Sequence, residues 1–281
     1  MILYRRILFA ILSFVIQIYP IFSEEYSPLE LAQEIFSRNP RINIFDHITG
    51  KYSGSPNGGD IDEKFHLQFL LLMQDEIDAV VAMKIYDKAG NGIDYYLFFR
   101  KETLWKMHAI RSLAIPRWFE LMVNELEQMP AEEIKSIINS NKKFAMFSTM
   151  DEYNFLVGNG RLILETDDNI INHFIENREE FERLRDLAIK EFEELFPNKK
   201  IEKQINLISG KGHEFKRLYI SSISVGDIEF GLSINFLIGG ILDNSVGFIY
   251  TDDPRNLPRM SPDRVIMIRE IGNGWYMYKT T

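Results

Sequence analysis

Residues 167–196 read DDNIINHFIENREEFERLRDLAIKEFEELF, the clearest helical pattern in the chain. Its apolar residues recur three and four positions apart and form one stripe: Ile170, Ile171, Phe174, Ile175, Phe181, Leu184, Leu187, Ala188, Phe192 and Leu195. Charged residues cover the other positions, so the pattern predicts one amphipathic helix with its stripe on a core. Asp167 or Asp168 caps its start, and Pro197 ends it.

Alternating apolar residues follow this helix and predict a set of antiparallel strands. The expected strands cover residues 218–224, 228–238, 245–251, 265–271 and 275–280. Residues 272–274 (Gly-Asn-Gly) close the last hairpin, where a positive φ is tolerated. A helix followed by strands in which apolar and polar residues alternate indicates an α+β domain, because the helix can cover the apolar face of the sheet.

The first half repeats this order of a helix and then strands. Ser27, Pro28 and Glu30 predict a capped helix start, and the strands are expected at residues 65–73, 77–86, 93–101 and 104–111. The polar, Gly-rich residues 50–62 predict a loop. We therefore expect four parts: a signal peptide at 1–23, a first α+β domain at 24–117, a helical connector at 118–167 and a second α+β domain at 168–281.

The order of elements over residues 27–281 resembles the nuclear-transport-factor-2-like and cystatin-like folds, in which a bent antiparallel sheet wraps a helix. The resemblance implies a tandem of two helix-on-curved-sheet domains, and folds of this kind often hold a hydrophobic cavity between sheet and helix. In enzymes of this fold a carboxylate or a histidine in the cavity transfers protons, and Asp94 and His108 are the matching catalytic candidates. Residues 239–250 (GGILDNSVGFIY) and 272–281 (GNGWYMYKTT) also resemble uncharacterised secreted bacterial proteins.

The first 23 residues, MILYRRILFAILSFVIQIYPIFS, have the order of a secretory signal. Arg5 and Arg6 precede an apolar run of about a dozen residues, which is too short to span a bilayer comfortably. We expect cleavage near Ser23 and export to the periplasm or the extracellular space; the alternative is an uncleaved N-terminal anchor. No other stretch approaches membrane length, so we expect no transmembrane span in the mature chain.

Charge and cysteine content exclude several functional classes. The formal net charge is −9, from 32 basic and 41 acidic residues, which gives no broad electrostatic reason to bind nucleic acid. The chain has no cysteine, so disulfides, thiolate metal sites and thiol nucleophiles are excluded. Its five histidines show no metal-binding spacing, and we expect no metal and no cofactor. A histidine pair on one sheet face, His66 with His108 beside Lys106, is the alternative.

Short glycine segments and serines give no sign of phosphate binding or nucleophilic catalysis. Residues 158–160, 210–212 and 272–274 lack the spacing of a phosphate-binding loop and are interpreted as turns. No G-x-S-x-G motif occurs, and nothing near Ser221 and Ser222 supplies a base.

Two residues are candidates for ligand binding. Asp243 follows Gly239 and Gly240, where a bulge would aim its carboxylate into a pocket; a turn aspartate is the alternative. Trp105 belongs to an aromatic set that lines a cavity or fills a core. An export signal without a catalytic signature predicts a non-enzymatic protein that binds a small-molecule ligand or a protein partner. The alternative is a small-molecule enzyme, which an open pocket with a buried Asp or His would favour.

Overall fold

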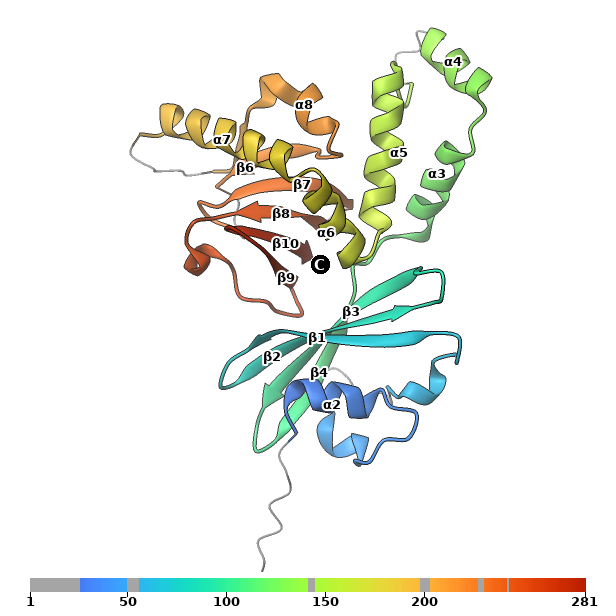
Figure 1. Cartoon of the computed structure of the whole chain (residues 1–281), viewed down its shortest axis with the longest axis vertical. Coiled ribbons are helices and arrows are strands. Elements are labelled where there is room, and N and C mark those ends of the chain that lie inside the picture. The colour runs from blue at the N-terminus through green and yellow to red at the C-terminus, as the bar shows by residue number, and fades with distance from the viewer. Residues whose placement is uncertain (1–25, 50–55, 141–144, 198–202, 227–229, 242) are drawn as a thin grey trace, which may run out of the picture.

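A computed structural model describes residues 26–49, 56–140, 145–197, 203–226, 230–241 and 243–281. In these residues the chain is mixed α+β, with seven α-helices and two antiparallel sheets (Figure 1). The expected signal segment, 1–23, lies outside the described residues. None of the helices in the described part is both long and apolar enough to cross a membrane.

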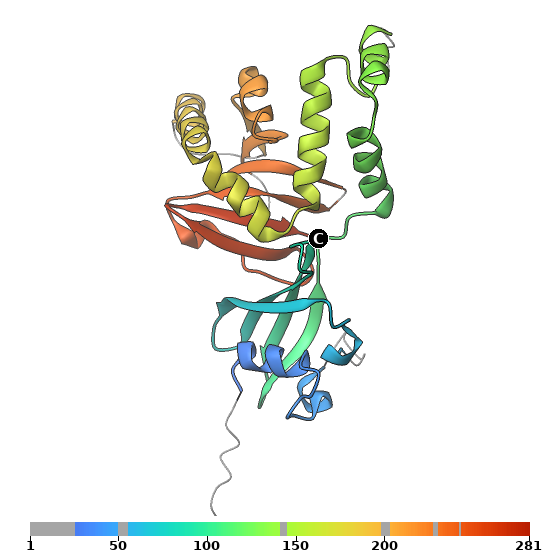
Figure 2. The same cartoon turned by 45° about the vertical axis from the view of Figure 1, so that its right-hand side comes forward.

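The first sheet has four antiparallel strands in the order β1-β2-β3-β4. Their bounds are β1 (His66–Gln74), β2 (Asp78–Tyr86), β3 (Gly92–Lys101) and β4 (Trp105–Arg111). Helix α2 (Pro28–Ile35) covers one face of this sheet, and Ser27 and Glu30 form the expected capping box at its start (Figure 2). The core between them comprises Leu31, Ala32, Ile35, Phe36, Ala79, Val81, Met83, Leu97, Phe99, Trp105 and Met107.

Three helices connect the two sheets: α3 (Arg117–Glu127), α4 (Ala131–Asn139) and α5 (Met150–Leu164). Residues 158–160, expected as a turn, lie inside α5, so that prediction is wrong. A Cβ atom on Gly158 would lie 2.0 Å from the ring of Tyr219, and one on Gly160 would lie 2.6 Å from Val123. Glycine is needed here because α5 packs closely on its neighbours, and the chain does not turn at this point.

The stretch predicted as one helix over 167–196 forms two, α6 (Asp167–Glu176) and α7 (Arg178–Leu195). They meet at Asn177, whose side-chain Nδ2 donates to the carbonyl oxygen of His173 at 2.8 Å. This bond takes the place of the backbone bond that a continuous helix would make to that carbonyl, so the helix breaks. The N-cap is Thr166; Asp167 and Asp168, expected as caps, are the first two helical residues.

The second sheet has six antiparallel strands in the order β5-β6-β7-β8-β10-β9. Their bounds are β5 (Ile205–Leu207), β6 (Ser222–Val225), β7 (Ile234–Ile241), β8 (Asn244–Tyr250), β9 (Val265–Gly272) and β10 (Trp275–Thr280). The Gly-Asn-Gly hairpin joins β9 to β10 as predicted, with positive φ at all three residues. Short 3-10 turns occupy Ile44–His47, Gly58–Asp60, Ser209–Lys211 and Pro254–Asn256.

Two strands of this sheet begin later than the sequence predicts. The strand expected at 218–224 begins at Ser222, because helix α8 (Gly212–Lys216) precedes it and Tyr219 has a positive φ of 59°. The strand expected at 228–238 begins at Ile234, and residues 227–229 lie outside the described part. A register shift between Leu237 and Gly239 confirms the expected bulge at the glycines.

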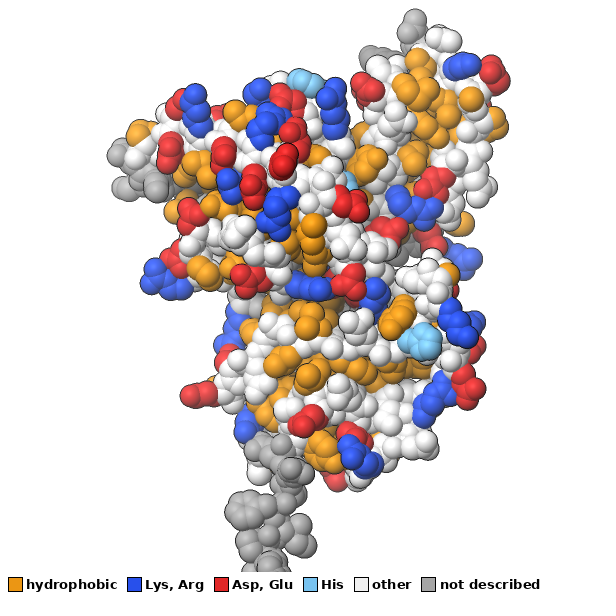
Figure 3. All heavy atoms as spheres, viewed as in Figure 1, with side chains coloured by type: hydrophobic (Ala, Val, Ile, Leu, Met, Phe, Trp, Pro, Cys, Tyr) orange, Lys and Arg blue, Asp and Glu red, His pale blue; other side chains and the backbone are white. Residues whose placement is uncertain are grey.

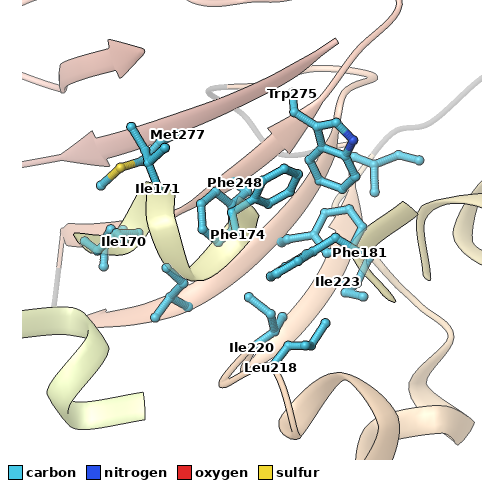
Figure 4. Packing of buried hydrophobic residues seen from close by; sticks show 14 of the residues in the cluster. Ile170, Ile171, Phe174, Phe181, Leu218, Ile220, Ile223, Phe248, Trp275 and Met277 are labelled. Atoms are coloured by element: carbon cyan, nitrogen blue, oxygen red, sulfur yellow. The ribbon is translucent and has the colours of Figure 1, made fainter. Parts of the chain in front are cut away.

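An aromatic cluster holds α6 and α7 on the second sheet (Figure 4). The rings of Phe174 and Phe181 lie 4.7 Å apart, and Phe181 lies 5.2 Å from Phe248 and 6.1 Å from Trp275. All four side chains are fully buried. The same core continues into the face of the first sheet that is turned away from α2, through Val80, Tyr96, Phe98 and Ala109.

Candidate functional site

Charged side chains are buried where the first sheet meets the second. Asp94 lies in β3, Asp167 is the first residue of α6, and Lys279 lies in β10, with exposed fractions of 9%, 3% and 4%. Charged residues are almost never this buried unless they are paired. With the fully buried Tyr96 they form the junction cluster, which consists of Asp94, Tyr96, Asp167 and Lys279.

Asp167 lies at the centre of the junction cluster. The Tyr96 hydroxyl donates to Oδ1 and Oδ2 of Asp167 at 2.8 and 3.0 Å, and Lys279 Nζ lies 2.7 Å from Oδ1. The backbone N–H of Asp167 donates to Asp94 Oδ2 at 2.8 Å, whereas Lys279 Nζ is 3.9 Å from that oxygen. Asp94 thus satisfies a free amide at the start of α6, where the helix dipole favours a carboxylate.

The surroundings of Asp94 disfavour its ionised form. Burial raises the pKa of its carboxyl to about 6, and the neighbouring charge of Asp167 acts in the same direction. Lys279 and the amide of Asp167 lower this pKa but do not offset the two larger effects. Burial and the Asp167 carboxylate also raise the pKa of the Tyr96 hydroxyl, which therefore stays a hydrogen-bond donor.

A second group of ion pairs lies beside the junction cluster and closer to solvent. Asp168 accepts from Arg269 Nη1 at 2.8 Å and from Lys84 Nζ at 2.9 Å. Partial burial acts to raise the pKa of Asp168, but these two bonds lower it overall. Since Lys84 lies in β2 and Arg269 in β9, Asp168 links the two sheets. Basic and acidic side chains gather along this boundary in Figure 3.

A cavity of about 340 Å³ lies beside the junction cluster. Asp94 and Lys279 form part of its wall, whereas Tyr96 and Asp167 do not. Thr166 also lines it and is 4% exposed, and its hydroxyl has no hydrogen-bond partner in the described structure. The wall combines apolar side chains with several polar and charged ones, and a concave site at which polar groups converge is a candidate ligand site. The remaining wall is formed by Gly92, Ile93, Ser112, Leu113, Ile115, Glu120, Arg161, Ile163, Leu164 and Glu165.

The structure does not bring the two catalytic candidates together. His108 lies in a separate hollow with Arg100 and Arg259, and its ring is 6.4 Å from that of Phe98. Phe98 follows Asp94 by four residues on β3, which is about 13 Å along a strand. Asp94 and His108 therefore cannot act on one substrate atom as an acid–base pair. Burial and the charge of Arg100 lower the pKa of His108.

The two ligand-binding candidates also lie apart. Trp105 is 5% exposed and packs in the core under α2. Asp243 is exposed at the edge of a cleft of about 520 Å³, which Asn235 and Tyr278 also line. This cleft is on the face of the second sheet turned away from α7. The backbone oxygen of Asp243 accepts from Thr280 Oγ1 at 2.7 Å, which fixes the hairpin at this point.

The alternative histidine pair is not formed. His66 lies in β1 and His108 in β4, which are opposite edges of the first sheet, with β2 and β3 between them. Across the described ranges, no group of three or more His, Asp or Glu side chains is arranged to hold a metal ion.

Sequence reasoning missed Tyr96, Asp167, Thr166 and Lys279 as site residues. The sequence does contain a pattern that points to Lys279. Trp275 and Met277 occupy alternate positions on the buried face of β10, and Lys279 is the next residue on that face. A charge at a core-facing position needs a buried partner. The partner itself is 112 residues away in the sequence at Asp167, which no local pattern indicates.

Comparison with known proteins found no matching family model, no matching curated protein and no matching solved structure.

Proposed function

We propose that this chain is an exported, non-enzymatic binding protein that holds a small molecule in the cavity beside the junction cluster. The observation that carries a ligand site is the position of Asp94, a buried carboxyl in the wall of a 340 Å³ cavity. This position by itself also fits the enzyme alternative, and the non-enzymatic role is preferred because His108, the second catalytic candidate, lies in a separate hollow. Buried titratable groups with raised pKa values concentrate at functional sites. Export is inferred from the order of basic, apolar and small residues over 1–23.

The finer architecture is part of the same proposal. Helix α2 in the first half, and the pair α6 and α7 in the second, precede an antiparallel sheet and cover one of its faces, which supports a tandem of two domains similar to the nuclear-transport-factor-2-like or cystatin-like folds. The cavity differs from the one that this resemblance implies, because Asp94 lies on the sheet face away from α2. The ligand would therefore bind between the halves.

A cavity-filling variant tests the binding proposal. Ser112→Trp places an indole at the cavity wall without removing a charge, whereas Ala114→Trp adds the same group at an exposed position outside it. A ligand at about 100 times its Kd stabilises a protein by about 2.7 kcal/mol, or about 5–10 °C in Tm for a chain of this size. In a thermal-shift screen of water-soluble metabolites, wild type and Ala114→Trp should show such a shift and Ser112→Trp should not. Equal shifts in all three proteins would place the ligand elsewhere.

A second candidate function is a small-molecule enzyme in which Asp94 transfers a proton. The specific observation in its favour is the pKa of about 6 for Asp94, which is close to the value that a general acid or base needs. Asp94→Asn should then retain the ligand-induced shift in Tm and lose turnover of the identified ligand. A ligand that wild type binds and leaves chemically unchanged would exclude this function.

A further inference from the structure

We infer that the cavity beside the junction cluster takes a small organic cation, an ammonium head on a short apolar body. This inference deepens the proposed function and rests on it. It identifies the chemical class of the ligand from the charges, the unpaired hydroxyl and the walls of the cavity.

The first step is the charge of the junction cluster. Asp167 and Lys279 form a close pair at 2.7 Å, and the Tyr96 hydroxyl completes the hydrogen bonding of Asp167. These three side chains balance without Asp94, whose distance to Lys279 is 3.9 Å. Asp94 therefore carries the excess negative charge. Asp94 and Lys279 both line the cavity, whereas Asp167, which balances the charge of Lys279, is set back from the wall.

The second step is the remaining polar wall. Thr166 also lies in the wall, and its buried hydroxyl has no hydrogen-bond partner in the described chain. Glu120 and Glu165 add two carboxylates. Arg161, the lining arginine, donates to both carboxylate oxygens of Glu127 and also interacts electrostatically with Glu165 and Glu120, so acidic groups outnumber it at this wall. The wall thus favours a cation over an anion.

The third step is the shape of the ligand. Apolar side chains form another part of the wall: Ile93, Leu113, Ile115, Ile163 and Leu164. At about 30 Å³ for each water-sized group, the volume accommodates on the order of ten heavy atoms. An ammonium donates to carboxylate and hydroxyl oxygens through three N–H groups, while an alkyl chain covers the apolar wall.

Three probes of one length test the inference: n-hexylamine, hexan-1-ol and hexanoate, titrated calorimetrically into the full chain at about pH 7.5, where the amine is protonated. We expect the amine to bind at least about tenfold more tightly than the alcohol, and hexanoate to bind most weakly. Asp94→Asn should remove the preference for the amine over the alcohol. Asp243→Asn, the same change at the exposed edge of the other cleft, should preserve it.

The outcomes separate the two proposals. Equal affinity for amine and alcohol, or tighter binding of hexanoate, overturns the cation inference and leaves a binding cavity in place. Loss of the preference in Asp243→Asn, with Asp94→Asn unaffected, overturns the assignment of the site. If no probe binds to wild type, and Ser112→Trp changes no ligand-induced shift, the proposed function fails as well.

A measurement on the wild-type chain covers the case in which Asp94→Asn does not fold. The groups that face Asp94 are Tyr96 on β3, Lys84 on β2, Asp167 on α6 and Lys279 on β10. Since the pKa of Asp94 is about 6, its ionised fraction falls about tenfold between about pH 7.5 and pH 5. The affinity for hexylamine should fall by a similar factor, and that for hexanol should stay constant. A constant affinity for hexylamine over this range contradicts the inference.

Discussion

Replacement of Asp94 by asparagine should stabilise this protein at neutral pH, although it removes one member of a buried network. The pKa of Asp94 rises from an ordinary value of 3.8 to about 6 in the folded chain. The folded state therefore binds a proton more tightly than the unfolded state, so stability is fully present below the lower value and falls as pH rises through the higher one. At 1.36 kcal/mol for each pKa unit, the ionised carboxylate costs about 3 kcal/mol at neutral pH.

The magnitude over an accessible pH range follows from the same two pKa values. Between about pH 5 and pH 7.5, Asp94 should lower the free energy of unfolding by about 1 kcal/mol. Asparagine resembles the protonated acid and can still accept from the amide of Asp167, so the variant lacks this contribution. The free energy of unfolding of Asp94→Asn should therefore exceed that of wild type by more at about pH 7.5 than at about pH 5, and the difference should equal this loss in wild type.

Denaturation in urea, followed by circular dichroism at both pH values, measures these free energies. Asp168→Asn is the matched control with the opposite sign, because its bonds to Arg269 and Lys84 lower the pKa of that carboxyl and the charge is stabilising. If Asp94→Asn is less stable than wild type, and more so at the higher pH, then the Asp94 carboxylate is stabilising and the electrostatic account of the junction cluster is wrong.

Phe181→Ala should cost about 3–5 kcal/mol, because the ring is fully buried among five other aromatic rings and its removal leaves a cavity. Glu180→Ala, at the surface of the same helix, should change the free energy of unfolding by about 0.5 kcal/mol or less. An unchanged Tm for Phe181→Ala would show that the apolar stripe is not part of the core. Protein purified from its native host should lack the first ~23 residues by intact-mass measurement, and a soluble product that retains them would contradict export. Limited proteolysis should cut first in residues 118–167 or 50–62, and early cuts within 228–238 would contradict the proposed partition.

The helix and strand content could be predicted because each element carries its own periodicity. The capping box at Ser27 and Glu30 and the Gly-Asn-Gly hairpin are local interactions between residues a few positions apart. The break at Asn177 could not be predicted from the apolar stripe, since it depends on whether one side-chain amide reaches one carbonyl. The glycines of α5 predict a turn because glycine favours turns. In the structure they lie inside the helix, where the missing side chains leave space for Tyr219 and Val123.

The candidate site could be predicted only in part, because it is made of residues far apart in the chain. The resemblance in fold points to Asp94 and His108 as catalytic candidates, and the structure places the two in separate hollows. What brings Asp94 to Asp167 and Lys279 is the packing of the first sheet on the second through Tyr96 and Phe98. The partition of the chain into two domains stays a prediction, and separation of the halves would expose these two rings to solvent.

A buried charge that does not stabilise the fold requires another reason for its presence. Helix capping does not explain it, since an asparagine or serine at position 94 would also accept the amide of Asp167 without a charge. Pairing does not explain it either, since Lys279 lies closer to Asp167 and balances that carboxylate. Networks of this kind are often no less stable when apolar residues replace them. The remaining distinction of Asp94 is that it lines the cavity, and a ligand cation there would supply the missing positive charge and offset the cost of burial.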